Sequence, residues 1–147
     1  MRAEKEEPDW EKLRNGRSSL LGYRMVEMAT GRSEVSWTPQ ENIGNPMGFV
    51  HGGFVGVMVD DIAGMAVSSM LPDWRAFPTA SLHVDFLRGI KVGDTVSCRG
   101  VVVRAGRRLT VADTTIHDRD GQLLARGTCM FAVDLSDTDR VGFTALS

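Results

Sequence analysis

The chain is poor in the residues that mark several large classes of protein. It has 2 cysteines among 147 residues, and neither Cys98 nor Cys129 stands in a CxxC or Cys/His pattern, which excludes a disulfide scaffold and the common metal motifs. GxSxG is missing, so the serine-hydrolase nucleophile turn is excluded. A formal net charge of -2 gives no general attraction to nucleic acid or to an anionic membrane.

A signal peptide and a membrane span are also not indicated. The first residues, MRAEKEEPDWEKLRNG, are charged and contain no apolar core of the kind that a secretory signal needs. Residues 52–71 approach the length of a membrane span, but paired aspartates and glycines within them argue against a lipid environment. We therefore expect a soluble cytoplasmic protein that binds neither membrane nor nucleic acid.

What the chain does contain is one long apolar helix followed by alternating strands. The stretch PDWEKLRN at 8–15 predicts a short leading helix, and GYRMVEMATGRSEVSWTP at 22–39 predicts a hairpin about the turn ATGR. The long helix is expected from about residue 52 until the stop signal of Pro72. Alternation of apolar and polar residues then predicts strands at 79–87 and near 95–104, 109–117 and 122–134.

This order of elements restricts the architecture. An antiparallel sheet with one apolar face needs a cover, and the only long helix is apolar nearly all round. We therefore predict an α+β fold in which the sheet wraps around this one helix. Since a single curved sheet of this size leaves part of the helix open, a second subunit is expected to complete the enclosure.

Two adjacent aspartates in the middle of this helix raise the question of function. Residues three or four positions apart share a helix face, which groups Asp60 with Gly56 and Gly64, so that a partner backbone or a ligand can approach there. Asp61 lies about 100° further round, among bulkier residues. Each carboxylate can be structural, accepting bonds from backbone, hydroxyl or arginine groups, or it can be functional.

The start of the helix, HGG at 51–53, favours a functional reading. Two glycines let a ligand approach the first unpaired N–H groups, whose dipoles stabilise developing negative charge. Asp60 follows two turns later. Its carboxylate reaches a carbonyl held at those N–H groups only if the ligand lies along the helix or if the carboxylate comes from a neighbouring subunit, and spacing leaves both open.

NPMGFVHGG followed by VMVD, with FLRGIKVGD and RAGRRL downstream, resembles the hotdog-fold acyl-CoA thioesterases of the phenylacetate-degradation type. The resemblance covers roughly residues 22–134. It implies a hotdog domain at 22–135, preceded by a helical extension at 1–21 and followed by a tail at 136–147. It also implies hydrolysis of an acyl- or aryl-CoA thioester without a further cofactor or metal, by a homodimer with shared active sites that assembles into a homotetramer.

The same resemblance implies roles for particular residues. Gly52 supplies a backbone N–H to the thioester carbonyl oxygen, while Asn45 and His51 shape the helix start and position the thioester or the attacking water. Asp60 is the catalytic carboxylate, as general base or as nucleophile, and Ser81 lies beside it. Asp60 and Ser81 of one subunit would then face Asn45, His51 and Gly52 of the other subunit.

Further residues are candidates for the site. A helix register that differs by one residue would make Asp61 the base and leave Asp60 structural. Met58 and Phe54 are candidates for an acyl pocket if their faces are open. The expected substrate-binding set comprises Gly53, Ser81, Phe54, Met58, Arg107 and Arg108, with the two arginines, together with Arg88 and Lys91, as contacts for coenzyme A phosphates.

Two other functions fit the same patterns. One is a non-catalytic acyl-CoA sensor, although the residues before the hairpin are too few for a helix-turn-helix domain. The other is a hydratase or dehydratase of enoyl thioesters, which needs a histidine and an acid that converge on the substrate. His83 and His117 lie in alternating strands, where we expect them to be solvated or packed. We therefore predict thioester hydrolysis.

Overall fold

The computed structural model describes residue 16, residues 18–72 and residues 75–136. Residues 16 and 18–21 are helical, whereas the helix predicted at 8–15 lies outside the described residues. The elements that follow are β1 (Tyr23–Ala29), β2 (Arg32–Trp37), the short 3-10 helix η1 (Glu41–Ile43), α2 (Gly52–Ser68), β3 (Thr79–Phe86), β4 (Val96–Arg104), β5 (Thr110–His117) and β6 (Leu123–Phe131). The predicted hairpin, long helix and four later strands are therefore confirmed to within a few residues.

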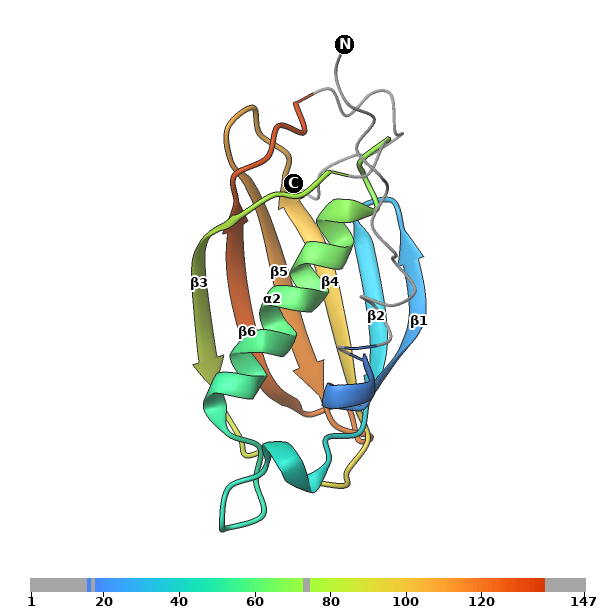
Figure 1. Cartoon of the computed structure of the whole chain (residues 1–147), viewed down its shortest axis with the longest axis vertical. Coiled ribbons are helices and arrows are strands. Elements are labelled where there is room, and N and C mark those ends of the chain that lie inside the picture. Colours follow the sequence, from blue (N-terminus) through green and yellow to red (C-terminus); the bar gives the residue numbers. More distant parts are fainter. Residues whose placement is uncertain (1–15, 17, 73–74, 137–147) are drawn as a thin grey trace.

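The strands form one antiparallel sheet in the order β1-β2-β4-β5-β6-β3. Figure 1 shows α2 crossing one face of this sheet, with its first turn at the same end of the molecule as the end of β3. β3 follows α2 in the chain but pairs with β6, so that it forms the edge opposite β1. One side of β3 therefore presents backbone N–H and C=O groups that no described strand pairs.

One face of α2 packs on the sheet and forms the centre of the core. Its buried residues recur at helical spacing: Val55, Gly56, Met58, Val59, Ile62, Ala63, Ala66 and Val67. Full burial of a side chain such as valine, isoleucine or methionine contributes roughly 1.5–3 kcal/mol. Among the described residues, no helix combines the length and the apolar composition needed to cross a membrane.

Two strand glycines allow α2 to lie directly on the sheet. A Cβ atom on Gly100 of β4 would lie 2.6 Å from the carbonyl oxygen of Ile62, and one on Gly127 of β6 would lie 2.5 Å from Cγ1 of Val59. A side chain at either position would push the helix away from the strands. Glycine is therefore required in two central strands, where it is otherwise unfavourable.

The opposite side of α2, beside β3, is open. Val57 of α2 is 42 % exposed, and Leu82 and Phe86 of β3 are 44 % and 59 % exposed. A Cβ atom on Gly56 would lie 3.8 Å from Cδ2 of Leu82, so the helix and the edge strand form one continuous apolar surface. We call the three exposed residues, Val57, Leu82 and Phe86, the α2–β3 surface. The expectation that one sheet leaves part of the helix uncovered is confirmed.

Candidate active site

The loop that leads into α2 is ordered by the side chain of Asn45. Its Oδ1 atom accepts hydrogen bonds from the backbone N–H groups of Met47, at 3.0 Å, and Phe49, at 3.1 Å. The backbone N–H of Asn45 donates in turn to the carbonyl of Phe49. An asparagine side chain that bonds nearby backbone stabilises a turn. Asn45 thus shapes the approach to the helix with its oxygen, while its Nδ2 group donates to no described residue.

The first N–H groups of α2 are open to a ligand. His51 is the N-cap, and its carbonyl accepts hydrogen bonds from the N–H groups of Phe54, at 3.0 Å, and Val55, at 3.2 Å. The N–H groups of Gly52 and Gly53 come earlier and, as at any helix start, have no partner within the helix. Both glycines are exposed. A carbonyl oxygen can therefore approach these N–H groups, where the helix dipole favours negative charge.

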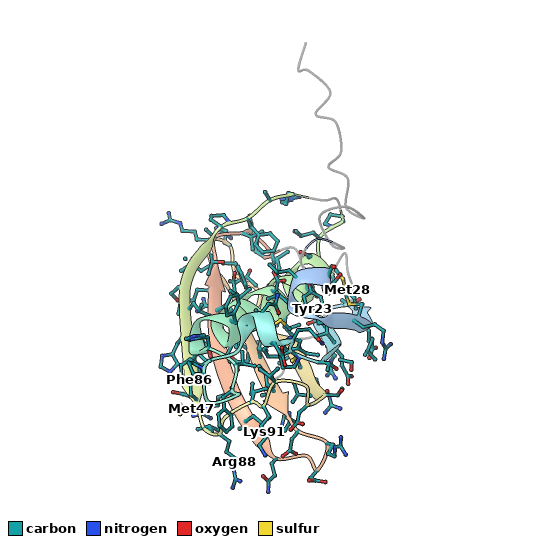
Figure 2. The ribbon with its side chains drawn as sticks, turned by 60° about the horizontal axis from the view of Figure 1, so that its bottom comes forward. Tyr23, Met28, Met47, Phe86, Arg88 and Lys91 are labelled. Atoms are coloured by element: carbon teal, nitrogen blue, oxygen red, sulfur yellow. The ribbon has the colours of Figure 1, made fainter. Side chains whose placement is uncertain are left out.

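A cleft of ≈ 330 Å³ opens beside the helix start. Its walls come from the loop before α2, from the first turn of α2 and from the segment after β3: Asn45, Met47, Phe49, Val50, Gly52, Val55, Phe86, Leu87, Arg88, Gly89, Ile90 and Ala125. The ring of Phe86 packs on Gly52, where a Cβ atom would lie 3.3 Å from its Cζ, and the ring of Phe49 packs on Gly89. Figure 2 shows Met47, Phe86, Arg88 and Lys91 at this same end of the molecule. The cleft is thus mainly apolar, with cations near its rim.

Asp60 lies two turns further along α2, on the side that faces β3. Thr79, at the start of β3, donates a hydrogen bond from Oγ1 to Oδ1 of Asp60 at 2.8 Å. Asp60 is partly exposed, so its carboxylate is not sealed inside the core. One oxygen of Asp60 is therefore held by a hydroxyl group, and the carboxylate can be reached from the α2–β3 surface.

Asp61 points toward the other edge of the sheet. The hydroxyl of Tyr23 on β1 donates to Oδ2 of Asp61 at 3.1 Å, and Tyr23 is itself only 5 % exposed. This bond joins α2 to β1. Asp61 thus has a structural partner, and Asp60 is the aspartate that faces β3 and the open surface.

A partly exposed carboxylate on a helix that begins with two open glycines, under a sheet of this order, matches a known family. The thioesterase superfamily matches residues 47–125, more than half of the chain, a range that includes Asp60, Thr79 and every residue of the cleft wall except Asn45. The chain belongs to the thioesterase superfamily. The family resemblance inferred from NPMGFVHGG and the downstream motifs is thereby confirmed.

Individual relatives agree with this assignment. Human acyl-coenzyme A thioesterase 13 is 26% identical over 119 residues, which are 79% of this chain and 83% of that protein. A Streptococcus mutans protein in a crystal structure with acetyl CoA is 28% identical, with a TM-score of 0.69 over 76% of this chain and 87% of that one. A phenylacetic acid degradation-related protein from Ralstonia eutropha is 29% identical, with a TM-score of 0.71 over 80% of this chain and 89% of that one. The fold is the hotdog fold, and the protein is a thioester hydrolase.

In this thioesterase Thr79, not Ser81, is the β3 residue beside Asp60. Ser81 pairs with Met130, whose side chain is exposed on the sheet face away from α2, whereas its neighbour Leu82 faces α2. A register shift between Thr79 and Ser81 turns Thr79 toward the helix. The prediction that Ser81 lies beside Asp60 is wrong, because strand alternation puts it on the outer face. A bulge at this point has no clear sequence signal.

The helix residues proposed to bind substrate have different environments. Met58 is 0% exposed and packs against the sheet, so the prediction that it lines the substrate pocket is wrong. It lies two residues before Asp60, about 200° away around the helix, which turns it into the core. Phe54 is partly buried against the core and is not part of the cleft wall. Gly53 is exposed beside Gly52 at the helix start.

Arg107 and Arg108 lie far from the helix start within one chain. They belong to the connection between β4 and β5, at the end of the molecule where α2 finishes (Figure 1). α2 has 17 residues, so its two ends are about 25 Å apart. Arg88 instead lines the cleft, and Lys91 pairs with Phe49 of its wall. Only another subunit could bring Arg107 and Arg108 to this cleft.

The two cysteines take no part in the cleft. Cys98 and Cys129 are free and buried. Burial raises the pKa of the Cys98 thiol, and burial, with the nearby Asp60 and Asp113 carboxylates, raises that of Cys129 to about 12. Both thiols therefore stay protonated and unreactive in the folded protein. Within the described part of the chain, no three His, Cys, Asp or Glu side chains gather in a metal-binding group.

The outer face of the sheet is polar. His83 lies 3.0 Å from Asp85, and hydrogen bonds from His83 and Arg126 lower the pKa of the Asp85 carboxyl. His117 lines an open groove of ≈ 690 Å³ on this face, and a second groove of ≈ 420 Å³ lies beside it. These grooves are larger than the cleft at the helix start. They contain none of the candidate catalytic residues, so their size does not indicate the reaction site.

Proposed function

We propose that this thioesterase hydrolyses an acyl-CoA thioester to the free acid and coenzyme A, with Asp60 as general base and the Gly52 N–H as donor to the carbonyl oxygen. The observation that carries the proposal is the position of Asp60, partly exposed and bonded to Thr79 on the open side of α2. The human relative is an acyl-coenzyme A thioesterase, and the Streptococcus mutans relative binds acetyl CoA, which supports coenzyme A as the carrier.

Within one chain, the Asp60 carboxylate and the Gly52 N–H are too far apart to act on the same thioester carbonyl. Gly52 and Asp60 are two turns apart on α2, about 12 Å along the helix axis. A general base and an oxyanion donor must each lie about 3 Å from the atoms on which they act. The site therefore needs a carboxylate from elsewhere, and a second copy of this chain carries one.

Pairing along the free edge of β3 supplies that carboxylate. When two copies of β3 pair antiparallel over their full length, Thr79 of one lies opposite the partner's Phe86. The ring of Phe86 packs on Gly52 of its own chain, so Thr79 comes to the partner's helix start. Asp60, bonded to Thr79, comes with it. The two-fold symmetry creates two such sites and covers the α2–β3 surface.

The reaction then uses groups from both copies. Asp60 takes a proton from a water molecule as the water oxygen attacks the thioester carbon. The carbonyl electrons move to oxygen, and the N–H of the partner's Gly52 stabilises the resulting oxyanion. When the carbonyl re-forms, the C–S bond breaks, and the thiolate leaves with the proton that Asp60 had taken. Thr79 holds Oδ1 of Asp60, which leaves Oδ2 for the water.

The cleft and its rim suit the other parts of the substrate. Phe49 and Phe86 offer apolar walls to the chain on either side of the thioester. Arg88 lines the cleft, and Lys91 lies near its rim, so both can contact phosphate groups of coenzyme A. The Nδ2 group of Asn45 can donate a hydrogen bond to the thioester or the water. Two buried free thiols are compatible with action in the reducing cytoplasm.

The neighbouring aspartates provide a matched pair of variants for the test. Asp60→Asn removes the base, so we expect kcat to fall by about 10²–10⁴ with little change in KM. Asp61→Asn weakens the bond from Tyr23, so we expect a lower Tm and a kcat within a few-fold of wild type. The measurement is thiol release from a panel of acyl- and aryl-CoA thioesters, followed with a thiol reagent.

Three results would contradict the proposal. If Asp60→Asn retains turnover, Asp60 is not the base. If wild type releases no thiol from any thioester in the panel, the substrate class is wrong. If trans-2-enoyl-CoA loses its enoyl absorbance without thiol release, the protein is a hydratase.

A further inference from the structure

Four small residues lie in register across the inner face of the sheet, directly beneath α2. Ser33 of β2 pairs with Gly100 of β4, Gly100 pairs with Thr114 of β5, and Thr114 pairs with Gly127 of β6. We call these four residues the hydroxyl–glycine row. The glycines leave room for the helix backbone, and the two hydroxyl groups are placed against it.

Both hydroxyl groups of the row donate to backbone carbonyls of α2. Oγ1 of Thr114 lies 3.0 Å from the carbonyl oxygen of Val59, and Oγ of Ser33 lies 2.7 Å from that of Ile62. These carbonyls lie in the interior of a helix, where each already accepts a bond from an N–H four residues later. The hydroxyl bonds are therefore additional, and they fix the height and the rotation of α2 on the sheet.

The carbonyl that Thr114 bonds belongs to the peptide unit that carries Asp60. Gly127 admits the side chain of Val59 to the sheet, and Sγ of Cys129 lies 4.0 Å from the same Val59 carbonyl. On the other side, Thr79 bonds the carboxylate of Asp60. Asp60 is thus held at its backbone from below and at its carboxylate from β3.

We propose that Thr114 is a positioning residue for Asp60. Its buried hydroxyl sets the orientation of the Val59–Asp60 peptide, and thereby the direction in which the carboxylate leaves the helix. This inference rests on the proposed function of Asp60 as general base. Thr114 is 1% exposed beneath α2, so it touches no substrate and acts only through the helix backbone.

Replacement of the hydroxyl by a methyl group should move Asp60. A methyl carbon 3.0 Å from a carbonyl oxygen is closer than van der Waals contact allows, so Thr114→Val pushes the helix off the sheet by a few tenths of an ångström. Catalytic geometry is sensitive to such shifts, since about 1 Å can cost about 100-fold in rate. We expect kcat to fall about tenfold, while KM changes less than about twofold, because Thr114 is not part of the cleft wall.

Thr110 supplies a matched control in the same strand. It is also fully buried on the inner face of β5, but its hydroxyl donates to the carbonyl of Val133, at 3.3 Å, and not to α2. Thr110→Val is the same chemical change and should lower Tm to a similar extent. We expect its kcat to stay within about twofold of wild type, because no bond to the helix is lost.

The experiment compares kcat and KM of Thr114→Val, Thr114→Ser and Thr110→Val on one acyl-CoA, at a temperature where circular dichroism shows every variant folded. Thr114→Ser keeps the hydroxyl and should restore kcat. Thr114→Ala, which adds no atom near the carbonyl, replaces the valine variant if that variant does not fold. Equal losses of kcat at 110 and 114, or no rescue by serine, overturn the inference. Inactive wild type, or an active Asp60→Asn, overturns the proposed function instead.

Discussion

At the scale of the residue, hydrogen-bond partners determine what the two adjacent aspartates do. Asp60 accepts a bond from Thr79 on β3, and Asp61 accepts one from Tyr23 on β1. These strands are the opposite edges of the sheet. Because consecutive helix residues diverge by about 100°, two neighbouring carboxylates can reach both edges from one helix. The pair joins α2 to β1 through one member and keeps the other at the open surface.

The buried thiols lead to a prediction at the same scale. Cys98 and Cys129 are 0% exposed, so the native protein should not react with a disulfide reagent at pH 8, whereas both thiols should react in guanidinium. The measurement is the absorbance of the released aryl thiolate, with Cys129→Ala as control, which should release half as much on unfolding. Rapid reaction of the native protein would show that the sheet opens around these residues.

The same thiols should make stability depend on alkaline pH. The pKa of Cys129 is raised from 9.0 to about 12 in the folded state, so the folded state holds its proton more tightly than the unfolded state. Its contribution to stability is complete below pH 9.0 and is lost as pH rises toward about 12. Denaturant midpoints measured across this range should fall more steeply for wild type than for Cys129→Ala.

At the scale of the element, the contact between α2 and the sheet depends on the strand glycines. A Cβ atom on Gly127 would lie 2.5 Å both from Cγ1 of Val59 and from the backbone carbonyl of His83. Since backbone cannot move aside easily, Gly127→Ala should destabilise the protein by about 1–3 kcal/mol, as overpacking does. Denaturant unfolding measures this change in the free energy of unfolding.

Gly64 provides the control for that substitution. It lies inside α2, and a Cβ atom there would meet only Cζ of Phe131, at 3.9 Å, which is an ordinary contact. Gly64→Ala should therefore leave stability unchanged or raise it by up to about 1 kcal/mol, as in other helix interiors. Equal destabilisation by both substitutions would contradict the assignment of the effect at Gly127 to its close contacts with Val59 and His83.

Helices and strands could be predicted from the sequence where one pattern of apolar residues dominates a segment. Alternation of apolar and polar residues predicted β3 to β6, because each strand buries one of its two faces. The long apolar run that ends before Pro72 predicted α2. Contacts that depend on a local irregularity could not be predicted. Thr79 faces Asp60 only because the register shifts before Ser81. The hydroxyl–glycine row requires the register of four strands, which no single segment specifies.

At the scale of the whole molecule, the two edges of the sheet differ in how they can be used. Both edge strands carry a register shift, β1 between Met25 and Glu27 and β3 between Thr79 and Ser81, so a bulge does not distinguish the two edges. β3 differs from β1 because it runs beside the open side of α2, with the exposed apolar side chains of the α2–β3 surface. Burial of apolar area favours association there. The edge beside this surface is also the edge beside Asp60, so the proposed assembly and the proposed catalytic role of Asp60 depend on one surface.

A complementation experiment tests whether the active site is shared. Asp60→Asn removes the carboxylate, and Gly52→Pro removes the N–H donor. Proline suits the backbone at this first helical position, because His51 before it has ψ 135 and the lost N–H has no helical partner. Its ring meets the tip of the Phe86 side chain, which must shift by a few tenths of an ångström. Each variant alone should be inactive. In a mixed dimer, however, one of the two sites combines the intact Asp60 of one copy with the intact Gly52 of the other.

Random mixing makes half of the dimers mixed, each with one working site of two, so co-refolded variants should recover about a quarter of wild-type activity. Mixtures in which either variant is in excess over the other should recover less activity, because fewer of the dimers are mixed. If Asp60 and Gly52 instead served the same carbonyl within one chain, every site in the mixture would lack one group. Activity would then stay at the level of the separate variants at all ratios, and pairing through β3 would have no catalytic role.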